Sequence, residues 1–300
     1  MDPDEGRVAA ARVQLREKGV YGPVTVEQWN GARLPHADGL VNLVVAEDLG
    51  GIAESEVMRV LAPGGVARIC RDGRWVEKVK SHPPDTDEWT HSYYDASGNA
   101  VSRDRAVGPP AHVRWIAEPR HARSHEHLPS INAVVSSAGR LFYIADEGAT
   151  GFLREAASWR LVARDAHNGL PLWRRRIDGW ESHMLHWGNT PSQLERRLVA
   201  VGDRVFVTLG LHAPVSALDA ATGETLRVYD GTEGAEEIAF HRGVLLLVCR
   251  RVTEERVAEM RKWERLAGQA ESPLFRRTTQ EPLIKILRAA DKRADLSILA

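Results

Sequence analysis

Two similar segments of this 300-residue chain lie 54 positions apart, and they constrain the fold more than any other feature. Asp165 is matched by Asp219, and Gly169 by Gly223. Each segment has the pattern of a strand, an Asp-x-x-x-Gly turn and a second strand, in which the Asp accepts hydrogen bonds from turn amides and the Gly adopts the positive φ of the return. A unit that recurs at a fixed offset indicates a repeat architecture rather than one compact fold.

Short strands joined by Gly-Arg and Gly-Asp-Arg turns are expected throughout the rest of this region. They are predicted at 133–135, 140–145, 159–164, 172–177, 198–201, 204–209, 215–218, 226–229, 238–240 and 244–249. Such spacing is typical of successive propeller blades. Apolar residues at helical spacing predict a helical insertion at about 252–293, after which Leu296–Ala300 restarts the strand that precedes Asp219 in the repeat. The Asp required next does not follow, so we expect an incomplete propeller over residues 113–300.

Residues 1–75 instead alternate between helix and strand patterns, which predicts an α/β domain. The predicted elements are a helix at 7–18, a strand at 24–29, a strand at 40–46 covered on both faces, a helix at 52–61 and a strand at 66–70. Pro63, Gly64 and Gly65 are expected to break the chain between the last two. Residues 76–112, rich in Pro, Asp and aromatic side chains, predict an extended connector.

Composition excludes several classes of partner. The chain has 40 basic and 41 acidic residues and a net charge of −1, so no field of one sign favours nucleic acid. It has two cysteines far apart, which do not indicate a disulfide framework. The sequence contains no apolar run of about 18 residues, so no membrane span is predicted. Its acidic start does not have the pattern of a signal peptide. The compartment is not assigned by these features.

Residues 30–38, 43–46 and 59–65 resemble the later half of a class I S-adenosylmethionine-dependent methyltransferase, most specifically in the Arg-Val-Leu-x-Pro-Gly-Gly run that starts at Arg59. The resemblance implies a partial Rossmann-like methyltransferase fold. It places Asn30 at the adenine-contacting position, with Glu47 and Asp48 after the next strand. The family's Gly-rich loop is not in this chain, so S-adenosylmethionine is expected only in a longer protein. The alternative interpretation of all three residues is the ordinary polarity of turns at strand ends.

Ala217–Gly223 is similar to the Leu-Asp-Ala-x-Thr-Gly repeat of pyrroloquinoline-quinone-dependent dehydrogenases and of the related outer-membrane assembly lipoprotein. The earlier copy keeps Asp165, Gly169 and Trp173. This resemblance implies a β-propeller, whereas pyrroloquinoline quinone itself is expected less, because many such propellers hold no cofactor. The combination of both segments looks like large bacterial proteins of mixed architecture.

His121, His125 and His127 are the sharpest candidates for a metal site. Imidazoles two residues apart on a strand face the same way, and three of them with a further ligand could hold a divalent Zn, Cu or Fe ion. The alternative is a polar loop between prolines whose histidines bind blade backbones.

Polar residues of the connector form a second candidate cluster. They are Asp87, Glu88, His91, Asp95 and Asn99. They could contain a general acid and base, but we expect a connector that is latched onto the propeller by hydrogen bonds.

These patterns together predict a fragment of a methyltransferase-like and β-propeller protein. We interpret it as a binding or scaffold module whose propeller loops meet a protein or glycan partner, with methyl transfer only in a longer chain. The alternative is a quinone- or metal-dependent oxidoreductase. Whether the protein is an enzyme is left open.

Overall fold

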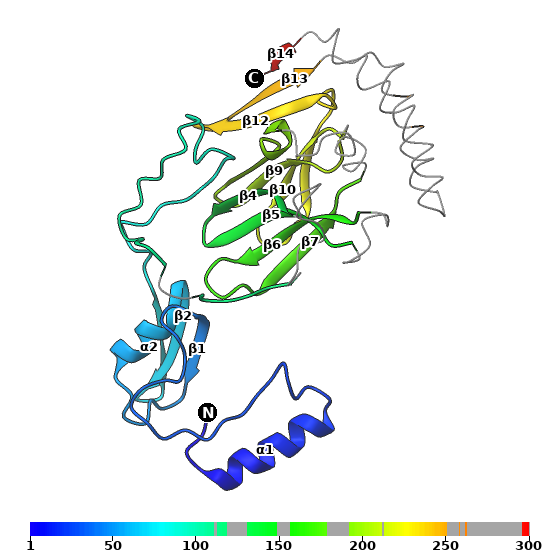
Figure 1. Cartoon of the computed structure of the whole chain (residues 1–300). Helices are drawn as coiled ribbons and strands as arrows, with labels where there is room; N and C mark the ends of the chain where they lie inside the picture. Colours follow the sequence, from blue (N-terminus) through cyan, green and yellow to red (C-terminus); the bar gives the residue numbers. More distant parts are fainter. Residues whose placement is uncertain are drawn as a thin grey trace. The chain divides into compact units, whose positions relative to one another are not determined.

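The computed structural model describes residues 1–110, 113–118, 131–148, 157–178, 192–211, 213–250, 258, 262 and 296–299. They divide into two compact units, Met1–His82 and Pro83–Ala300. Strands dominate the regular structure of the described part (Figure 1). None of its helices is long and apolar enough to cross a membrane.

The first unit contains one small sheet with a helix on one face. Its elements are α1 (Glu5–Glu17), β1 (Val41–Ala46), α2 (Glu54–Val60), β2 (Leu61–Arg71) and β3 (Arg74–Val79). The sheet order is β1-β2-β3, with β1 parallel to β2 and β2 antiparallel to β3. Val57 of α2 packs on Leu61, Ala67 and Ile69 to form a small core.

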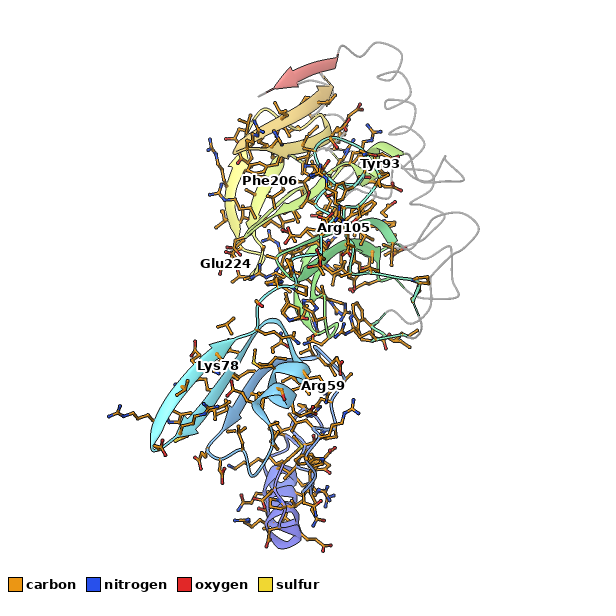
Figure 2. All side chains as sticks on the ribbon, turned by 90° about the vertical axis from the view of Figure 1, so that its left-hand side faces the viewer. Arg59, Lys78, Tyr93, Arg105, Phe206 and Glu224 are labelled. Atoms are coloured by element: carbon orange, nitrogen blue, oxygen red, sulfur yellow. The ribbon has the colours of Figure 1, made fainter. Side chains whose placement is uncertain are left out.

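Arg59, labelled in Figure 2, ties the loop before β1 to helix α2. Its guanidinium pairs with Glu56 at 2.6 Å and donates to the carbonyl oxygens of Leu34 at 3.1 Å and His36 at 3.0 Å. Glu56 also accepts from the backbone N–H of Leu34 at 2.7 Å. The hydrogen bond from Arg59, helped by that of Leu34, lowers the pKa of Glu56 to about 2.

The expectation of a partial Rossmann-like α/β domain is wrong. Among the named strands of the described part, only β1 and β2 pair in parallel, and the remaining ladders are antiparallel. The strand expected at 24–29 makes only isolated bridges. Strand β1 is not covered on both faces, because Leu43 is 55% and Val45 58% exposed.

A hairpin of β2 and β3 lies where the sequence predicted a break at Pro63 to Gly65 and the start of the connector at residue 76. Strand β2 runs through Pro63 and Gly64, and the ladder with β1 shifts register there. Asp72 and Gly73 both have positive φ, which is the geometry of a tight hairpin turn. An Asp-Gly pair between two strand patterns is the local sequence signal for such a hairpin.

The second unit is built from successive antiparallel sheets. Sheet one contains β4 (Ile131–Ser137), β5 (Arg140–Asp146), β6 (Trp159–Asp165) and β7 (Pro171–Arg176). Sheet two contains β8 (Leu198–Val201), β9 (Arg204–Thr208), β10 (Val215–Asp219) and β11 (Thr225–Tyr229), preceded by the short helix α4 (Ser192–Glu195). Sheet three contains β12 (Ala235–His241), β13 (Val244–Arg250) and β14 (Leu296–Leu299). Each strand expected in this region overlaps an observed one.

Strands β8, β9 and β10 of sheet two are buried on both faces, as inner strands of a propeller blade are, whereas β11 is exposed. Leu198, Val205 and Val207 pack with residues of sheet one, such as Phe142, in one apolar cluster. Alternate residues of the same strands, such as Phe206 (Figure 2), pack in a second cluster with sheet three. Side chains alternate between the two faces of a strand, so one sheet can pack on a neighbouring sheet at each face. Sheets packed face to face in series are typical of a propeller-like architecture.

A tryptophan docks on the glycine of each of the two Asp-x-x-x-Gly turns. Trp173 of β7 donates its indole N–H to the carbonyl of Ala220 at 3.0 Å, and its ring covers Gly223 in the β10–β11 turn. Trp115 does the same to Ala166, at 3.2 Å, and to Gly169 in the β6–β7 turn. Both glycines have φ of +74°, so the 54-residue repeat is confirmed in geometry.

The carboxylates of the repeat act as predicted. Asp165 accepts from the backbone N–H groups of His167 and Asn168. Asp219 accepts in the same way from those of Ala221 and Thr222. The hydrogen bond from Thr222 lowers the pKa of Asp219. Both cysteines are free thiols. The helical insertion expected at 252–293 lies outside the described residues, except for Ala258 and Lys262, which are helical.

Candidate functional site

The connector, residues 83–110, is latched to all three sheets by three consecutive residues. The carbonyl of Trp89 accepts from the backbone N–H of Ser136 at 2.7 Å, on β4. The carbonyl of Thr90 accepts from the N–H of Ala200 at 3.0 Å, on β8. The Nε2 atom of the next residue, His91, accepts from the N–H of Phe240 at 3.1 Å, on β12. We call these three hydrogen bonds the latch.

The three donors of the latch hold equivalent positions in their sheets. Strands β4, β8 and β12 are each the first strand and an edge of a sheet. In each following hairpin the donor pairs with the residue five positions later: Ser136 with Leu141, Ala200 with Val205 and Phe240 with Leu245. An edge strand presents unpaired N–H groups that must find an acceptor when buried. The latch supplies one such acceptor per sheet and so covers neighbouring edges.

His91 is held in one neutral form by its partners. Because Nε2 accepts from Phe240, the proton of the ring is on Nδ1, which lies 2.7 Å from Oγ1 of Thr90. That hydroxyl in turn donates to the carbonyl of Tyr94 at 3.3 Å. The side chain is 6% exposed, and burial, with a smaller opposing effect of Asp95, lowers its pKa. Both ring nitrogens are therefore committed, and the imidazole is not poised as a proton carrier.

The two acidic residues before the latch are committed as well. Glu88 accepts from the hydroxyl of Ser137 at 2.9 Å and from the N–H of Ala138 at 2.7 Å, in the β4–β5 hairpin. Asp87 accepts from the hydroxyl of Tyr94 at 2.6 Å and from the N–H of Arg103 at 2.7 Å. Burial acts to raise the pKa of Asp87, but these hydrogen bonds outweigh it and the pKa is lowered. The prediction of a hydrogen-bonded latch is confirmed.

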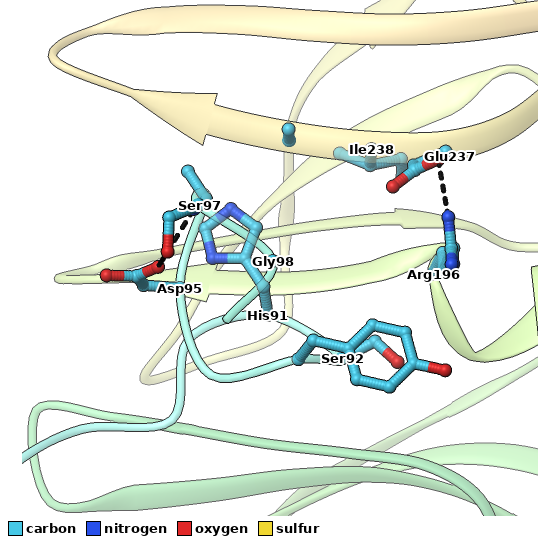
Figure 3. A pocket seen from close by; sticks show the side chains of 11 residues that line it. His91, Ser92, Asp95, Ser97, Gly98, Arg196, Glu237 and Ile238 are labelled. Carbon is cyan, nitrogen blue, oxygen red and sulfur yellow. Dashed lines mark hydrogen bonds and ion pairs between the residues drawn. The ribbon is translucent and has the colours of Figure 1, made fainter. Parts of the chain in front are cut away.

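A pocket of about 170 Å³ lies where the connector meets sheet three. Residues 91–93 and 95–98 of the connector form one wall, and Glu237, Ile238 and Ala239 of β12 form the other, with Arg196 beside them (Figure 3). Ile238 is positioned by its N–H, which donates to the carbonyl of Arg196 at 3.0 Å. The pocket therefore depends on the latch, which holds its two walls together.

Arg196 is fixed over the pocket by two contacts. Its Nη1 donates to Oε2 of Glu237 at 3.0 Å, and its guanidinium carbon lies 5.3 Å from the centre of the Tyr93 ring. The hydrogen bond to Glu237 raises the pKa of Arg196. Its Nε atom is buried and has no hydrogen-bond partner among the described residues. Leaving such a donor unpaired costs free energy, which the two contacts of the guanidinium offset.

Asp95 lines the connector wall of the pocket, and its carboxylate is turned toward Ser97 and away from Arg196 and Glu237 (Figure 3). Its Oδ1 accepts from the backbone N–H of Ser97 at 2.8 Å and from the hydroxyl of the same residue at 2.5 Å. These hydrogen bonds lower the pKa of Asp95, so it is ionised at neutral pH. Its Oδ2 lies 3.8 Å from Arg103, which is too far for a hydrogen bond.

The cofactor and metal residues predicted from the sequence lie elsewhere. Asn30, Glu47 and Asp48 are all exposed, and Asp48 accepts from the N–H of Gly50 in a turn. Cofactor binding by these residues stays a prediction. The three histidines expected to bind metal, His121, His125 and His127, lie outside the described residues. Within the part that the structure describes, no group of three His, Cys, Asp or Glu could hold a metal ion.

Sequence reasoning missed Arg196 and Glu237. They lie 103 and 144 positions after Tyr93 in the sequence, and only the stacking of sheets two and three brings them to it. The run Glu195-Arg196-Arg197, placed just before β8, was the only local signal. A charged run at a strand end is usually solvated, so this signal did not distinguish a site residue.

Comparisons with known proteins add little about activity. No family model matches the chain, and no curated protein matches it. Among solved structures, the chain is similar to a europium-containing methanol dehydrogenase, with 14% identity and a TM-score of 0.35. The likeness covers 54% of this chain and 27% of that one, so this chain spans about a quarter of its length. It is too distant to bear on ligand or reaction. Nothing in these comparisons supports the methyltransferase resemblance.

Proposed function

We propose that the Pro83–Ala300 unit is a propeller-type binding module that takes a small polar ligand in the pocket between connector and sheet three. The observation that carries this proposal is the pocket itself, about 170 Å³ in volume and lined by the charged side chains of Asp95, Arg196 and Glu237. Asp95 and Glu237 supply acceptors from both walls of the same pocket.

Binding is favoured over catalysis because the titratable groups of the connector are already engaged. His91 uses both ring nitrogens, and Asp87 and Glu88 accept several hydrogen bonds each. A general acid or base must be free to exchange its proton with a reacting group. Side chains that hold a fold together in this way offer fixed contacts instead.

The test is a thermal-shift and calorimetric screen of the full-length chain against small sugars, amino acids, carboxylates and amines. Ala96 lines the pocket and makes no contact of the latch, so Ala96→Phe should fill the pocket and leave the fold intact. Ala106 lies on the exposed part of the same connector, which makes Ala106→Phe the matched control.

We expect at least one compound to bind the wild type and the Ala106→Phe variant, and to lose binding to Ala96→Phe. The proposal is wrong if no compound binds, or if binding is equal in both variants. Turnover of an alcohol by the purified chain with added quinone or metal would favour the oxidoreductase alternative.

A further inference from the structure

The sheet of the first unit has two faces of opposite character. Helix α2 packs on one face (Figure 1), where Ile69 of β2 is buried. On the other face Leu43 and Val45 of β1 are more than half exposed. Val79 of β3 is 59% exposed and Trp75 is 48% exposed on this same side. Strands that pair in parallel, as β1 and β2 do, are usually covered on both faces, so this side has the character of a contact surface.

The strand register arranges this exposed side in three rows. Leu43, Val66 and Val79 form the first row, Val45, Arg68 and Glu77 the second, and Cys70 and Trp75 the third. Residues paired across neighbouring strands point to the same side of a sheet, so each row runs across the strands. We call these eight residues the open face. Its first and third rows are apolar, and both of its charges lie in the middle row.

Arg68 and Glu77 form a loose ion pair in that middle row. Nε of Arg68 lies 4.0 Å from Oε2 of Glu77, and the two side chains are 54% and 60% exposed. The guanidinium carbon of Arg68 lies 5.9 Å from the centre of the Trp75 ring. An exposed pair at this distance contributes little to the fold. One arginine beside one glutamate is also self-complementary, because a second copy of the face can present its glutamate to the arginine and its arginine to the glutamate.

A two-fold axis that runs parallel to the strands, between β2 and β3, brings two open faces together in this way. It places β2 of each copy opposite β3 of the other, so Arg68 meets Glu77 of the second copy in two symmetric contacts. In the third row the same axis places Trp75 opposite the small side chain of Cys70. A two-fold axis across the strands would instead place Arg68 opposite itself. The charges therefore select the first arrangement.

We propose that the open face is an interface between two copies of this chain, which pack face to face as the two sheets of a sandwich do. The apolar rows drive association because they leave water, and the two intermolecular ion pairs fix the orientation. Three strands of about six residues make a face of about 15 by 20 Å, which is smaller than a standard interface. We therefore expect a reversible dimer. This inference is independent of the pocket in the second unit.

The closing experiment measures sedimentation velocity of the full-length chain from micromolar to submillimolar concentration. The variants are Arg68→Glu and Glu77→Arg, studied separately and as an equimolar mixture. Arg74→Glu is the matched control, because Arg74 is exposed on the same hairpin, lies on the opposite side of the sheet and undergoes the same change of charge. Thermal unfolding of each variant checks that it folds.

We expect the wild type and Arg74→Glu to dimerise with equal strength. Arg68→Glu and Glu77→Arg each place like charges opposite one another in both contacts, so each should dimerise at least about tenfold more weakly. The mixture should recover the dimer, because a copy with two glutamates then faces a copy with two arginines. The proposal is overturned if the wild type stays monomeric throughout, if the two substitutions leave the dimer unchanged, or if the mixture does not recover it.

Discussion

The substitution Gly223→Ala tests whether tryptophan docking holds sheet one to sheet two. A Cβ atom at this position would lie 2.6 Å from Cδ2 and 2.7 Å from Cε3 of Trp173, closer than such atoms pack. The residue also has φ of +74°, which disfavours any side chain. The indole must therefore move, and its hydrogen bond to the carbonyl of Ala220 is lost.

The cost has two parts that can be separated. A side chain in the left-handed region costs about 1–2 kcal/mol. Gly202, in the β8–β9 turn, has φ of +59° and no atom within 4 Å of the place a Cβ would take, so Gly202→Ala should show this part alone. At Gly223 the displaced ring adds about 1 kcal/mol for its hydrogen bond and about 1–2 kcal/mol for lost packing. We expect Gly223→Ala to exceed Gly202→Ala by roughly 2–3 kcal/mol.

Native-state hydrogen exchange read by mass spectrometry gives the free energy of opening for each part of the full-length chain. Peptides from β10 and β11 report the docked turn, and peptides from β1 to β3 serve as an internal reference that should not change. In a Trp173→Leu background the ring is absent, so Gly223→Ala should cost no more than Gly202→Ala. Equal costs for the two glycine substitutions in the wild-type background would refute the docking argument.

Three further predictions follow from single contacts. His91→Ala leaves the N–H of Phe240 without an acceptor and should cost about 1–3 kcal/mol in exchange from β12. Because burial lowers the folded-state pKa of His91, its stabilising effect is full above the ordinary value of 6.5 and is lost as the pH falls through the lowered value; this part of the acid melting curve should be absent in His91→Ala. Glu56, with a folded-state pKa of about 2, stabilises the first unit above pH 4.5 and loses that effect as the pH falls through 2, so Glu56→Gln should flatten the acid dependence of exchange in α2. Glu88→Ala, which removes the acceptor for Ser137, should speed exchange in the β4–β5 hairpin by about tenfold or more, whereas Glu88→Gln should do so less.

The strands of the second unit could be predicted from the sequence because each carries its own signal. Alternating apolar residues and Asp-x-x-x-Gly or Gly-Asp-Arg turns are local features, and they specify both the strands and the hairpins between them. The first unit was predicted less well because a short apolar run such as 40–46 has the same pattern whether one or both of its faces are covered. Its surroundings decide between these cases, and the exposed Leu43 and Val45 show that one face is open.

The pocket could not be predicted because its walls come from segments that no local pattern connects. Tyr93, Arg196 and Glu237 meet only after sheets two and three have stacked and the connector has crossed their edges. The polar character of the connector was visible, and it correctly indicated a latch. The blade positions that the connector binds could not be predicted, because two of the three acceptors of the latch are backbone carbonyls, which every residue possesses.

Of the three acceptors of the latch, only the one from His91 depends on the identity of a side chain. Trp89 and Thr90 accept through the backbone, so substitution there would keep both acceptors if the chain kept its course. The third acceptor is a side-chain atom, Nε2 of His91, and few other side chains reach as far with an uncharged acceptor. Sheet three is also the sheet that completes the pocket. A change at His91 should thus loosen β12 and reduce ligand binding together, as both exchange from β12 and calorimetry would show.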